Sequence, residues 1–184
     1  MKKALVTGVS WETGIGFAIC KRLIADGFYV YAVYHSEDST AKHYFEQNPD
    51  NIEFVQCDLS ARDSLRVLIK YFVSSNIKLD AIINNAGAFG GEEDINNYAI
   101  ETWDYVFAVN VNAPLILATG LKSQLNYRSV IVNMVSTDGM KGSFSSMAYA
   151  ASKAALINLT DSLAINFGYD EKKIRVTAVC PRLG

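Results

Sequence analysis

Short apolar runs alternate with segments of helical periodicity along the whole of this sequence. The runs have the length of buried strands, and the segments between them carry apolar residues on one helical face. Strands separated by helices of this length pair in parallel through right-handed crossovers. The pattern therefore predicts an α/β fold with three layers and a doubly wound parallel sheet. The predicted strands are residues 4–7, 29–34, 52–56, 79–83, 130–135 and 175–179, and the later helices are 101–121 and 148–167.

Length and composition favour one domain. The 184 residues suffice for one substantial core and leave little room for a second, so we expect a single domain over residues 1–184. Apolar residues make up 50% of the chain and its net charge is −2. Because this charge gives no broad electrostatic attraction to polyanions, we expect neither nucleic acid nor a membrane as a partner.

The cysteines and the apolar runs bear on metal binding and location. Cys20, Cys57 and Cys180 lie far apart, share no metal-ligand spacing and are odd in number. We therefore expect no metal site and a reducing compartment. The first strand begins almost at Met1, and no apolar run approaches the length of a membrane span. These features lead us to expect a cytoplasmic protein.

Two of the earlier helices carry more detailed patterns. In the first, Ile15, Ile19 and Leu23 recur on one face. Ser60 with Asp63 resembles a capping arrangement at the start of the helix that follows the third strand. The buried stripe of that helix is expected to contain Leu65, Leu68, Ile69, Phe72 and Val73.

Three glycines surround the end of the first strand. Gly8 lies where a tight turn must form, and Gly14 and Gly16 lie at the start of the first helix, where a side chain would block close approach. Backbone N–H groups and the positive end of the helix would then face a pyrophosphate. The alternative is an ordinary turn from strand to helix. The position of the glycines between strand and helix favours the phosphate-binding interpretation.

Several stretches, in the same order, resemble the short-chain dehydrogenase/reductase family. The resemblance runs from Lys3 to about Pro181 and implies a Rossmann fold, a nicotinamide dinucleotide cofactor and hydride transfer with a small carbonyl or alcohol substrate. Branches of this family act on different substrates, and 3-oxoacyl thioesters are among the candidates here. The matching stretches are T7-G8 with G14-I15-G16, C57-D58-L59, N84-N85-A86-G87, V109-N110-V111-N112, S136 and Y149-A150-A151-S152-K153.

The glycine loop departs from the commonest pattern of that family. Five residues, 9–13, separate Gly8 from Gly14, where most members have three. This spacing resembles the enoyl-acyl-carrier-protein reductases, whereas Gly14, Gly16 and the Y-A-A-S-K run resemble the main branch of carbonyl reductases, which includes the 3-oxoacyl-acyl-carrier-protein reductases. The longer loop could bring Ser10 to the phosphates and Trp11 over the cofactor. The alternative is a solvated loop tip.

The catalytic assignment rests on Tyr149 and Lys153, which are four residues apart and so share a helical face. A free phenol ionises only near pH 10, so a nearby positive charge is needed to favour the phenolate at neutral pH. The resemblance implies that Tyr149 is the general acid/base and that Lys153 stabilises the phenolate and holds the ribose hydroxyls. It further implies that Ser136 binds the substrate oxygen and that Asn110 holds a water linking Lys153 to solvent. The alternative for a Tyr–Lys pair alone is a surface pair.

The same resemblance assigns cofactor contacts elsewhere. Asp58 would accept a hydrogen bond from the adenine amino group with Leu59 beside it, and the alternative for Asp58 is a helix cap. Asn85, Ala86 and Gly87 would line the ribose, and the alternative for this run is a plain turn after a strand. The cofactor-binding set predicted from the sequence is Gly8, Ser10, Gly14, Ile15, Gly16, Tyr34, Asp58, Leu59, Asn85, Ala86, Gly87, Tyr149 and Lys153.

Cofactor choice depends on the end of the second strand. An acidic residue there would bind the ribose 2′-hydroxyl and repel a 2′-phosphate. This chain has Tyr34, followed by His35 and Ser36, which can hydrogen-bond a phosphate. Against this, Glu12 and Thr13 stand where many NADP-dependent relatives carry a basic residue. We expect NADP, with NAD as the alternative.

The family members continue past the sixth strand with a substrate lid and a seventh strand. This chain stops at C180-P181-R182-L183-G184, with Arg182 where a glycine is expected, so we expect neither feature in it.

Two functions stay open. Intact Ser136, Tyr149 and Lys153 favour an NAD(P)-dependent reductase or dehydrogenase, whereas the missing lid favours a non-catalytic dinucleotide-binding module. Relatives pair helices equivalent to 101–121 and 148–167, so we also expect a homo-oligomer, at least a dimer.

Overall fold

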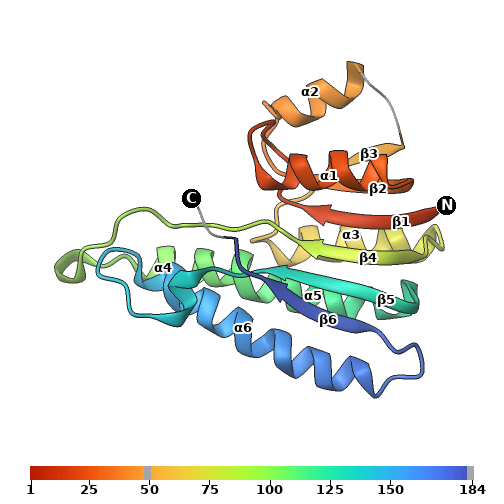
Figure 1. Cartoon of the computed structure of the whole chain (residues 1–184). Helices are drawn as coiled ribbons and strands as arrows, with labels where there is room; N and C mark the ends of the chain where they lie inside the picture. Colours follow the sequence, from red (N-terminus) through yellow and green to blue (C-terminus); the bar gives the residue numbers. More distant parts are fainter. Residues whose placement is uncertain (48–50, 182–184) are drawn as a thin grey trace.

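A computed structural model describes residues 1–47 and 51–181, in which six strands form one parallel sheet in the order β3-β2-β1-β4-β5-β6 (Figure 1). Arg182, where the sequence departs from the expected glycine, lies outside the described residues. The strands are β1 (Lys2–Thr7), β2 (Phe28–Tyr34), β3 (Ile52–Gln56), β4 (Leu79–Asn84), β5 (Leu125–Met134) and β6 (Arg175–Val179). The α-helices are α1 (Ile15–Ala25), α2 (Thr40–Gln47), α3 (Arg62–Ser74), α4 (Ile100–Phe107), α5 (Ala113–Gly120) and α6 (Met147–Gly168).

Helices cover both faces of the sheet, so the predicted three-layer, doubly wound fold is confirmed. Alternate residues of β1 point to opposite faces. Leu5 belongs to the core formed with α3, α5 and α6, whereas Ala4 and Val6 belong to the core formed with α1 and α2. Both cores are apolar and continuous along the strands, as parallel sheets require.

The chain reverses its direction of winding between β1 and β4. From β1 it moves outward through β2 to β3, then returns to pair β4 with the other side of β1. Because all strands are parallel, their carboxyl ends lie at one edge of the sheet. Ligands of such sheets bind outside this edge, at the point where the strand order reverses. The ends of β1 and β4 therefore mark the expected site.

The helix predicted over residues 101–121 is wrong in one respect, because it is interrupted. A five-residue π-helix, Ala108–Asn112, separates α4 from α5. Pro114 has no N–H to donate to the carbonyl of Asn110, so the α-helical bonding pattern cannot continue unchanged through this region. The insertion changes the helical phase around Asn110, and π-helical segments of this kind are frequent at functional sites.

Three smaller expectations are also corrected. The N-cap of α3 is Ala61 with no side-chain cap hydrogen bond, because Ser60 instead donates to Asp58. Val73 is 44% exposed and lies outside the buried stripe. Strand β5 begins five residues earlier than predicted, since Leu125 pairs with Leu79 beyond a register irregularity between Leu79 and Ala81. Within the described ranges, no helix has the length and apolarity needed to cross a membrane.

Candidate functional site

A cleft of about 370 Å³ opens at the carboxyl edge of the sheet, where β1 and β4 end. Its volume falls within the range of small-molecule and cofactor sites. Among the residues predicted to bind the cofactor, nine line this cleft. They are Gly8, Ser10, Ile15, Tyr34, Asp58, Leu59, Asn85, Ala86 and Gly87. The remaining wall includes Trp11, Val33, His35, Cys57, Ala88, Tyr105 and Val109.

Two of the three glycines are required by close backbone contacts. Gly8 has a φ of +76°, and a Cβ there would lie 2.7 Å from the Cα of Ala86. At Gly16, a Cβ would lie 2.4 Å from the carbonyl oxygen of Gly8. The start of α1 therefore packs directly against the end of β1. We call the backbone surface formed at Gly8 and Gly16 the glycine cradle, and side chains at these two positions would prevent it from forming. Such a cradle at a helix N-terminus fits the pyrophosphate of a dinucleotide. Gly14, the N-cap of α1, makes a turn with Trp11 and does not line the cleft.

Asn85 holds the two central strands together at the cleft. Its Nδ2 donates to the carbonyl oxygens of Thr7, at 3.0 Å, and Gly8, at 3.1 Å. The Thr7 hydroxyl in turn accepts from the N–H of Ala86 at 3.1 Å. Asn85 therefore shapes the cleft through its amide. Thr7 belongs to the T7-G8 match, but sequence reasoning gave it no role, since the role of its side chain is recognisable only from these contacts.

The base of the longer glycine loop is attached to Ser39 and to the first turn of α2. The carbonyl oxygen of Ser10 accepts from the Ser39 hydroxyl at 3.0 Å and from the N–H of Ala41 at 3.3 Å. The N–H of Glu12 donates to Thr40 at 3.1 Å. The loop is thus more than a solvated tip. Trp11 is 53% exposed and forms part of the cleft wall, the placement needed to cover a ligand.

Asp58 has one carboxylate oxygen committed to local structure. Its Oδ1 accepts from both the N–H and the hydroxyl of Ser60, at 2.9 and 2.7 Å. These hydrogen bonds hold the pKa of the Asp58 carboxyl below its usual range. Asp58 is therefore ionised at neutral pH and fixes the turn before α3. The Asp58 carboxylate is also part of the cleft wall, so it can accept a hydrogen bond from a ligand there.

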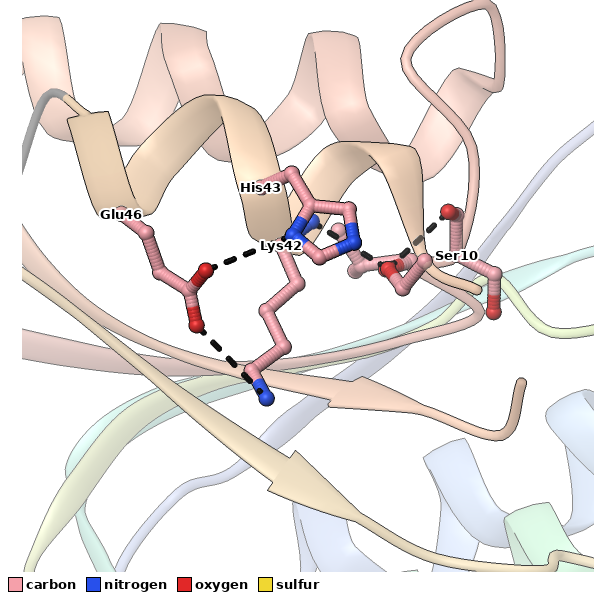
Figure 2. A network of polar contacts seen from close by, with 6 residues as sticks. Ser10, Lys42, His43 and Glu46 are labelled. Carbon is pink, nitrogen blue, oxygen red and sulfur yellow. Dashed lines mark hydrogen bonds and ion pairs between the residues drawn. The ribbon is translucent and has the colours of Figure 1, made fainter. Parts of the chain in front are cut away.

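A basic residue missed by sequence reasoning lies beside Tyr34. The Lys42 ammonium is 5.4 Å from the centroid of the Tyr34 ring and 3.6 Å from Glu46 Oε1 on the next turn of α2 (Figure 2). Hydrogen bonding with Tyr34, followed by the charge interaction with it, raises the pKa of Lys42. Only the fold brings α2 over the end of β2, so the sequence motif could not indicate this contact.

Tyr149 and Lys153 share a face of α6, as predicted. The Lys153 ammonium lies 5.5 Å from the centroid of the Tyr149 ring and donates to the carbonyl oxygen of Met134 at 2.7 Å. Lys153 is only 3% exposed, and this burial lowers the pKa of its ammonium to about 8. A Cβ at Gly87 would lie 3.6 Å from Lys153 Nζ. The ammonium therefore lies at the junction between the cleft and α6.

Ser136 lies two residues after the end of β5 and is half-buried. Its hydroxyl oxygen accepts from the N–H of Asp138 at 3.2 Å, which leaves the hydroxyl proton available to a ligand. The 3₁₀ turn that follows, Thr137–Met140, packs tightly on α6. A Cβ at Gly139 would lie 2.7 Å from the carbonyl carbon of Lys153. Gly139 is therefore a further residue that sequence reasoning missed, and its lack of a side chain lets the Ser136 turn pack against α6.

Asn110 is fully buried and its amide bridges two segments. Nδ2 donates to the carbonyl oxygen of Ala88 and to the Ser152 hydroxyl, both at 2.9 Å, and Oδ1 accepts from the N–H of Ala88 at 2.7 Å. Asn110 thus joins the loop after β4 to α6. Its remaining capacity to bind a water is one lone pair of Oδ1.

The structure brings the predicted residues together as two adjoining groups. The nine cleft residues lie on one side, and Ser136, Tyr149, Lys153 and Asn110 lie on the other, with Gly87 and Ala88 between them. Gly14, Gly16 and the four residues predicted to be catalytic do not line the cleft itself. The arrangement offers an anion cradle, a phenol, a buried ammonium and a hydroxyl donor. Such a set can bind a dinucleotide and exchange a proton with an oxygen beside it.

Residues 2–183 match the protein family described as short chain dehydrogenase. The chain belongs to this family. The short-chain dehydrogenases are oxidoreductases, and the matched residues include the glycine loop and the Tyr149–Lys153 pair.

Relatives in the family differ in their named substrates. The chain is 33% identical over 183 residues to a 3beta-hydroxysteroid dehydrogenase of Mediterraneibacter gnavus, covering 98% of this chain and 65% of the relative. It is 31% identical over 189 residues to glucose 1-dehydrogenase 2 of Bacillus subtilis, covering 98% and 70%. The chain therefore spans about two thirds of the length of these relatives. Their names show the family and leave the substrate of this chain open.

Solved structures of short-chain dehydrogenases superpose on the whole chain. A 4-hydroxyisoleucine dehydrogenase complexed with NADH has a TM-score of 0.88 and 27% identity, over 100% of this chain and 74% of that one. A short chain dehydrogenase from Burkholderia cenocepacia in complex with NADP has a TM-score of 0.85 and 32% identity, over 98% and 73%. These neighbours share the sheet and its flanking helices.

Proposed function

We propose that this chain binds a nicotinamide dinucleotide in the cleft and transfers hydride between it and a carbonyl or alcohol substrate, with Tyr149 as the general acid/base. The observation that carries the proposal is the junction at Gly87, where the cleft meets the buried Lys153 ammonium beside the Tyr149 ring. The glycine cradle, which a Cβ at Gly8 or Gly16 would fill, supports the dinucleotide. The NADH and NADP complexes of similar proteins support the same class of cofactor.

The residues of the chain divide the remaining work. When bound, a nicotinamide cofactor supplies or accepts the hydride. In the reducing direction, the Ser136 hydroxyl donates a hydrogen bond to the substrate carbonyl oxygen, which orients and polarises it. The Tyr149 hydroxyl donates its proton to that oxygen as negative charge develops there. In the oxidising direction, the Tyr149 phenolate accepts the proton from the alcohol.

Lys153 serves two purposes in this mechanism. Its ammonium stabilises the Tyr149 phenolate and hydrogen-bonds the ribose hydroxyls. The bond to Met134 uses one of its three protons and leaves two for these partners. Asn110 holds the loop after β4 against α6, and its free lone pair on Oδ1 can accept from a water that returns protons to Lys153.

The region around Tyr34 supports NADP(H) over NAD(H). An acidic side chain that would repel a 2′-phosphate is absent at Tyr34, the last residue of β2. His35 is part of the cleft wall, and the Lys42 ammonium, which lies over the ring of the cleft residue Tyr34, adds positive charge near this end of the cleft. Glu46 already pairs with Lys42, which limits the strength of this preference (Figure 2).

The substrate follows less directly from the site. A 3-oxoacyl thioester is one candidate, and the 3beta-hydroxysteroid and glucose dehydrogenases among the relatives add hydroxysteroids and sugars. The shared chemistry is a carbon that carries a hydroxyl group and a hydrogen and is converted to a carbonyl, or the reverse reaction. We therefore propose that class and not an individual compound.

The proposed function is tested by removing the hydroxyl group of Tyr149. Tyr149→Phe should lower the rate of ketone reduction by about 10²-fold or more, because only the proton donor is removed, and should leave the NADPH dissociation constant nearly unchanged. Lys153→Ala should weaken NADPH binding and slow turnover together. The rate is followed by the absorbance of NADPH with a panel of ketones that includes a steroid ketone and a 3-oxoacyl thioester.

Tyr169→Phe, an exposed residue at the end of α6, is the matched control. Reduction by Tyr149→Phe within a few-fold of the unmodified chain would rule out Tyr149 as the acid. If the unmodified chain binds NADPH and reduces none of these ketones, the non-catalytic dinucleotide-binding module is the better account. Failure to bind either dinucleotide would overturn both functions.

A further inference from the structure

The loop after β4 is fastened to the catalytic helix at two separated points. The first is the Asn110 amide, which binds both the backbone of Ala88 and the Ser152 hydroxyl of α6. The second is Glu93, whose carboxylate binds the opposite end of this loop segment to the first turn of α6. The segment between these points carries Phe89, whose ring centroid lies 5.5 Å from that of Tyr149. The loop therefore surrounds the start of the helix that bears Tyr149.

Glu93 makes an extensive set of contacts at that helix start. Its Oε2 accepts from the N–H of Met147, and its Oε1 and Oε2 accept from the N–H of Ala148 at 3.1 and 3.2 Å. The N–H of Glu93 donates to the carbonyl oxygen of Ser145 at 3.0 Å, and the Tyr98 hydroxyl donates to Oε1 at 3.5 Å. The side chain thus satisfies two of the four N–H groups that a helix leaves without intrahelical partners. Its negative charge also lies at the positive end of the helix.

The local sequence does not provide this cap. Ser146 occupies the N-cap position, but its side chain makes no cap hydrogen bond, because its hydroxyl pairs with that of Ser143 at 2.6 Å. The first turn of α6 also contains no acidic residue. The two first amides of this helix therefore depend on a carboxylate that is 54 and 55 residues away in the chain.

Tyr149 directly follows the two residues that Glu93 holds. The position of its phenol relative to Ser136 depends on where the first turn of α6 lies and on the contact with Phe89. We propose that Glu93 is a positioning residue, whose carboxylate fixes the first turn of α6 and through it holds Tyr149 in place for proton transfer. This inference rests on the proposed function, because it requires Tyr149 to be the acid/base.

A cap that served stability alone would behave differently. Its loss would lower the resistance of the whole domain to unfolding and leave the environment of the Tyr149 ring in the folded state unchanged. A positioning role predicts a local change at the folded helix start, together with a fall in kcat that is not matched by weaker NADPH binding. The local change at the Tyr149 ring can be measured without any substrate, so it separates a positioning role from a purely stabilising one.

The first experiment uses the folded chain labelled with ¹³C in its tyrosine rings. In Glu93→Ala, the Tyr149 ring signal, assigned through Tyr149→Phe, should shift or broaden. Amide exchange at Met147 and Ala148 should accelerate by about fivefold, the factor expected for loss of a typical cap. Glu93→Gln keeps the shape and one acceptor oxygen, so its Tyr149 signal and its exchange rates should lie between those of the unmodified chain and those of Glu93→Ala. The neighbouring and exposed Glu92 is the matched control, and Glu92→Ala should change neither signal.

The second experiment measures ketone reduction with NADPH. Glu93→Ala should lower kcat by about tenfold or more, with the NADPH dissociation constant within about twofold of that of the unmodified chain. An unchanged Tyr149 signal in Glu93→Ala would overturn the proposal, as would a loss of NADPH affinity equal to the loss of kcat. A chain that binds NADPH but reduces no ketone still decides the proposal through the Tyr149 signal. A chain that binds no NADPH contradicts the proposed function, and the ring and exchange signals still report whether Glu93 positions Tyr149.

Discussion

The cleft and the proposed catalytic cluster, which consists of Ser136, Tyr149, Lys153 and Asn110, adjoin each other at Gly87. Different kinds of contact hold the two regions together. The cleft depends on backbone approach, as at Gly8 and Gly16, where a Cβ would lie within 3 Å of main-chain atoms. The catalytic cluster depends on buried polar side chains, above all Asn110 and Lys153, which are 0% and 3% exposed. Close backbone packing is the main determinant of the first region, whereas buried side chains that hydrogen-bond to the backbone and to one another determine the second.

This difference predicts how each region fails. A shape built from backbone contacts cannot accommodate an added methyl group without moving a strand or helix, because protein interiors are closely packed. A buried polar cluster fails when a donor or acceptor loses its partner, or when a buried charge is no longer compensated. Substitutions in the two regions should therefore differ in size, pH dependence and effect on cofactor binding.

The largest effect should come from breaking the cradle. In Gly16→Ala the new methyl group would lie 2.4 Å from the Gly8 carbonyl oxygen and 2.7 Å from Asn85 Nδ2. We expect a loss of at least about 3 kcal/mol in the free energy of unfolding and no measurable NADPH binding. Chemical denaturation and calorimetry measure the two. Gly168→Ala is the control, because a Cβ there meets nothing within 4 Å. NADPH affinity within a few-fold of that of the parent chain would refute the cradle.

A smaller and pH-dependent effect should mark the buried ammonium. Burial lowers the pKa of Lys153 to about 8, so between that pH and about 10.4 the unfolded chain binds more protons than the folded one. The free energy of unfolding should therefore rise with pH across this window, by about 3 kcal/mol from this lysine. Below pH 8 the cost of the buried charge is present in full.

Denaturation of the free chain at pH 7 and pH 10 tests this effect. The stability of the unmodified chain relative to Lys153→Met should increase by about 2–3 kcal/mol over that interval. Lys70→Met, at an exposed position on α3, is the control for the general effect of removing a lysine. A difference between the chain and Lys153→Met that is the same at both values of pH would show that the ammonium is not held at a cost by its surroundings.

The contrast between the two regions also explains what the sequence could predict. The fold followed from local patterns, since the apolar runs of the strands and the helical periodicities are properties of neighbouring residues. The glycines of the cradle could be placed for the same reason, because their positions at the end of β1 and the start of α1 are local. Their requirement for close approach to Ala86 and Asn85 became measurable only in the fold.

The contacts that hold the proposed catalytic cluster could not be predicted from local sequence patterns. Glu93 and Met147 are 54 residues apart, and Asn110 and Ser152 are 42 apart, so no spacing rule joins them. Pro114 is a local signal of the interruption in the predicted helix 101–121, because proline cannot donate the hydrogen bond that α-helical geometry requires. Lys42 reaches Tyr34 only because α2 packs over the end of β2. The motifs indicated which residues belong to the site and left open what holds them.

Calorimetric titration of the unmodified chain with NADPH and with NADH tests the central claim most directly. The cleft, with its glycine cradle and the Lys42 ammonium beside Tyr34, predicts one dinucleotide per chain, with NADPH bound about tenfold more tightly than NADH. Tighter binding of NADH would contradict the assignment of the region around Tyr34 to a 2′-phosphate. The absence of binding heat and of thermal stabilisation with both dinucleotides would contradict the account of the cleft as a cofactor site.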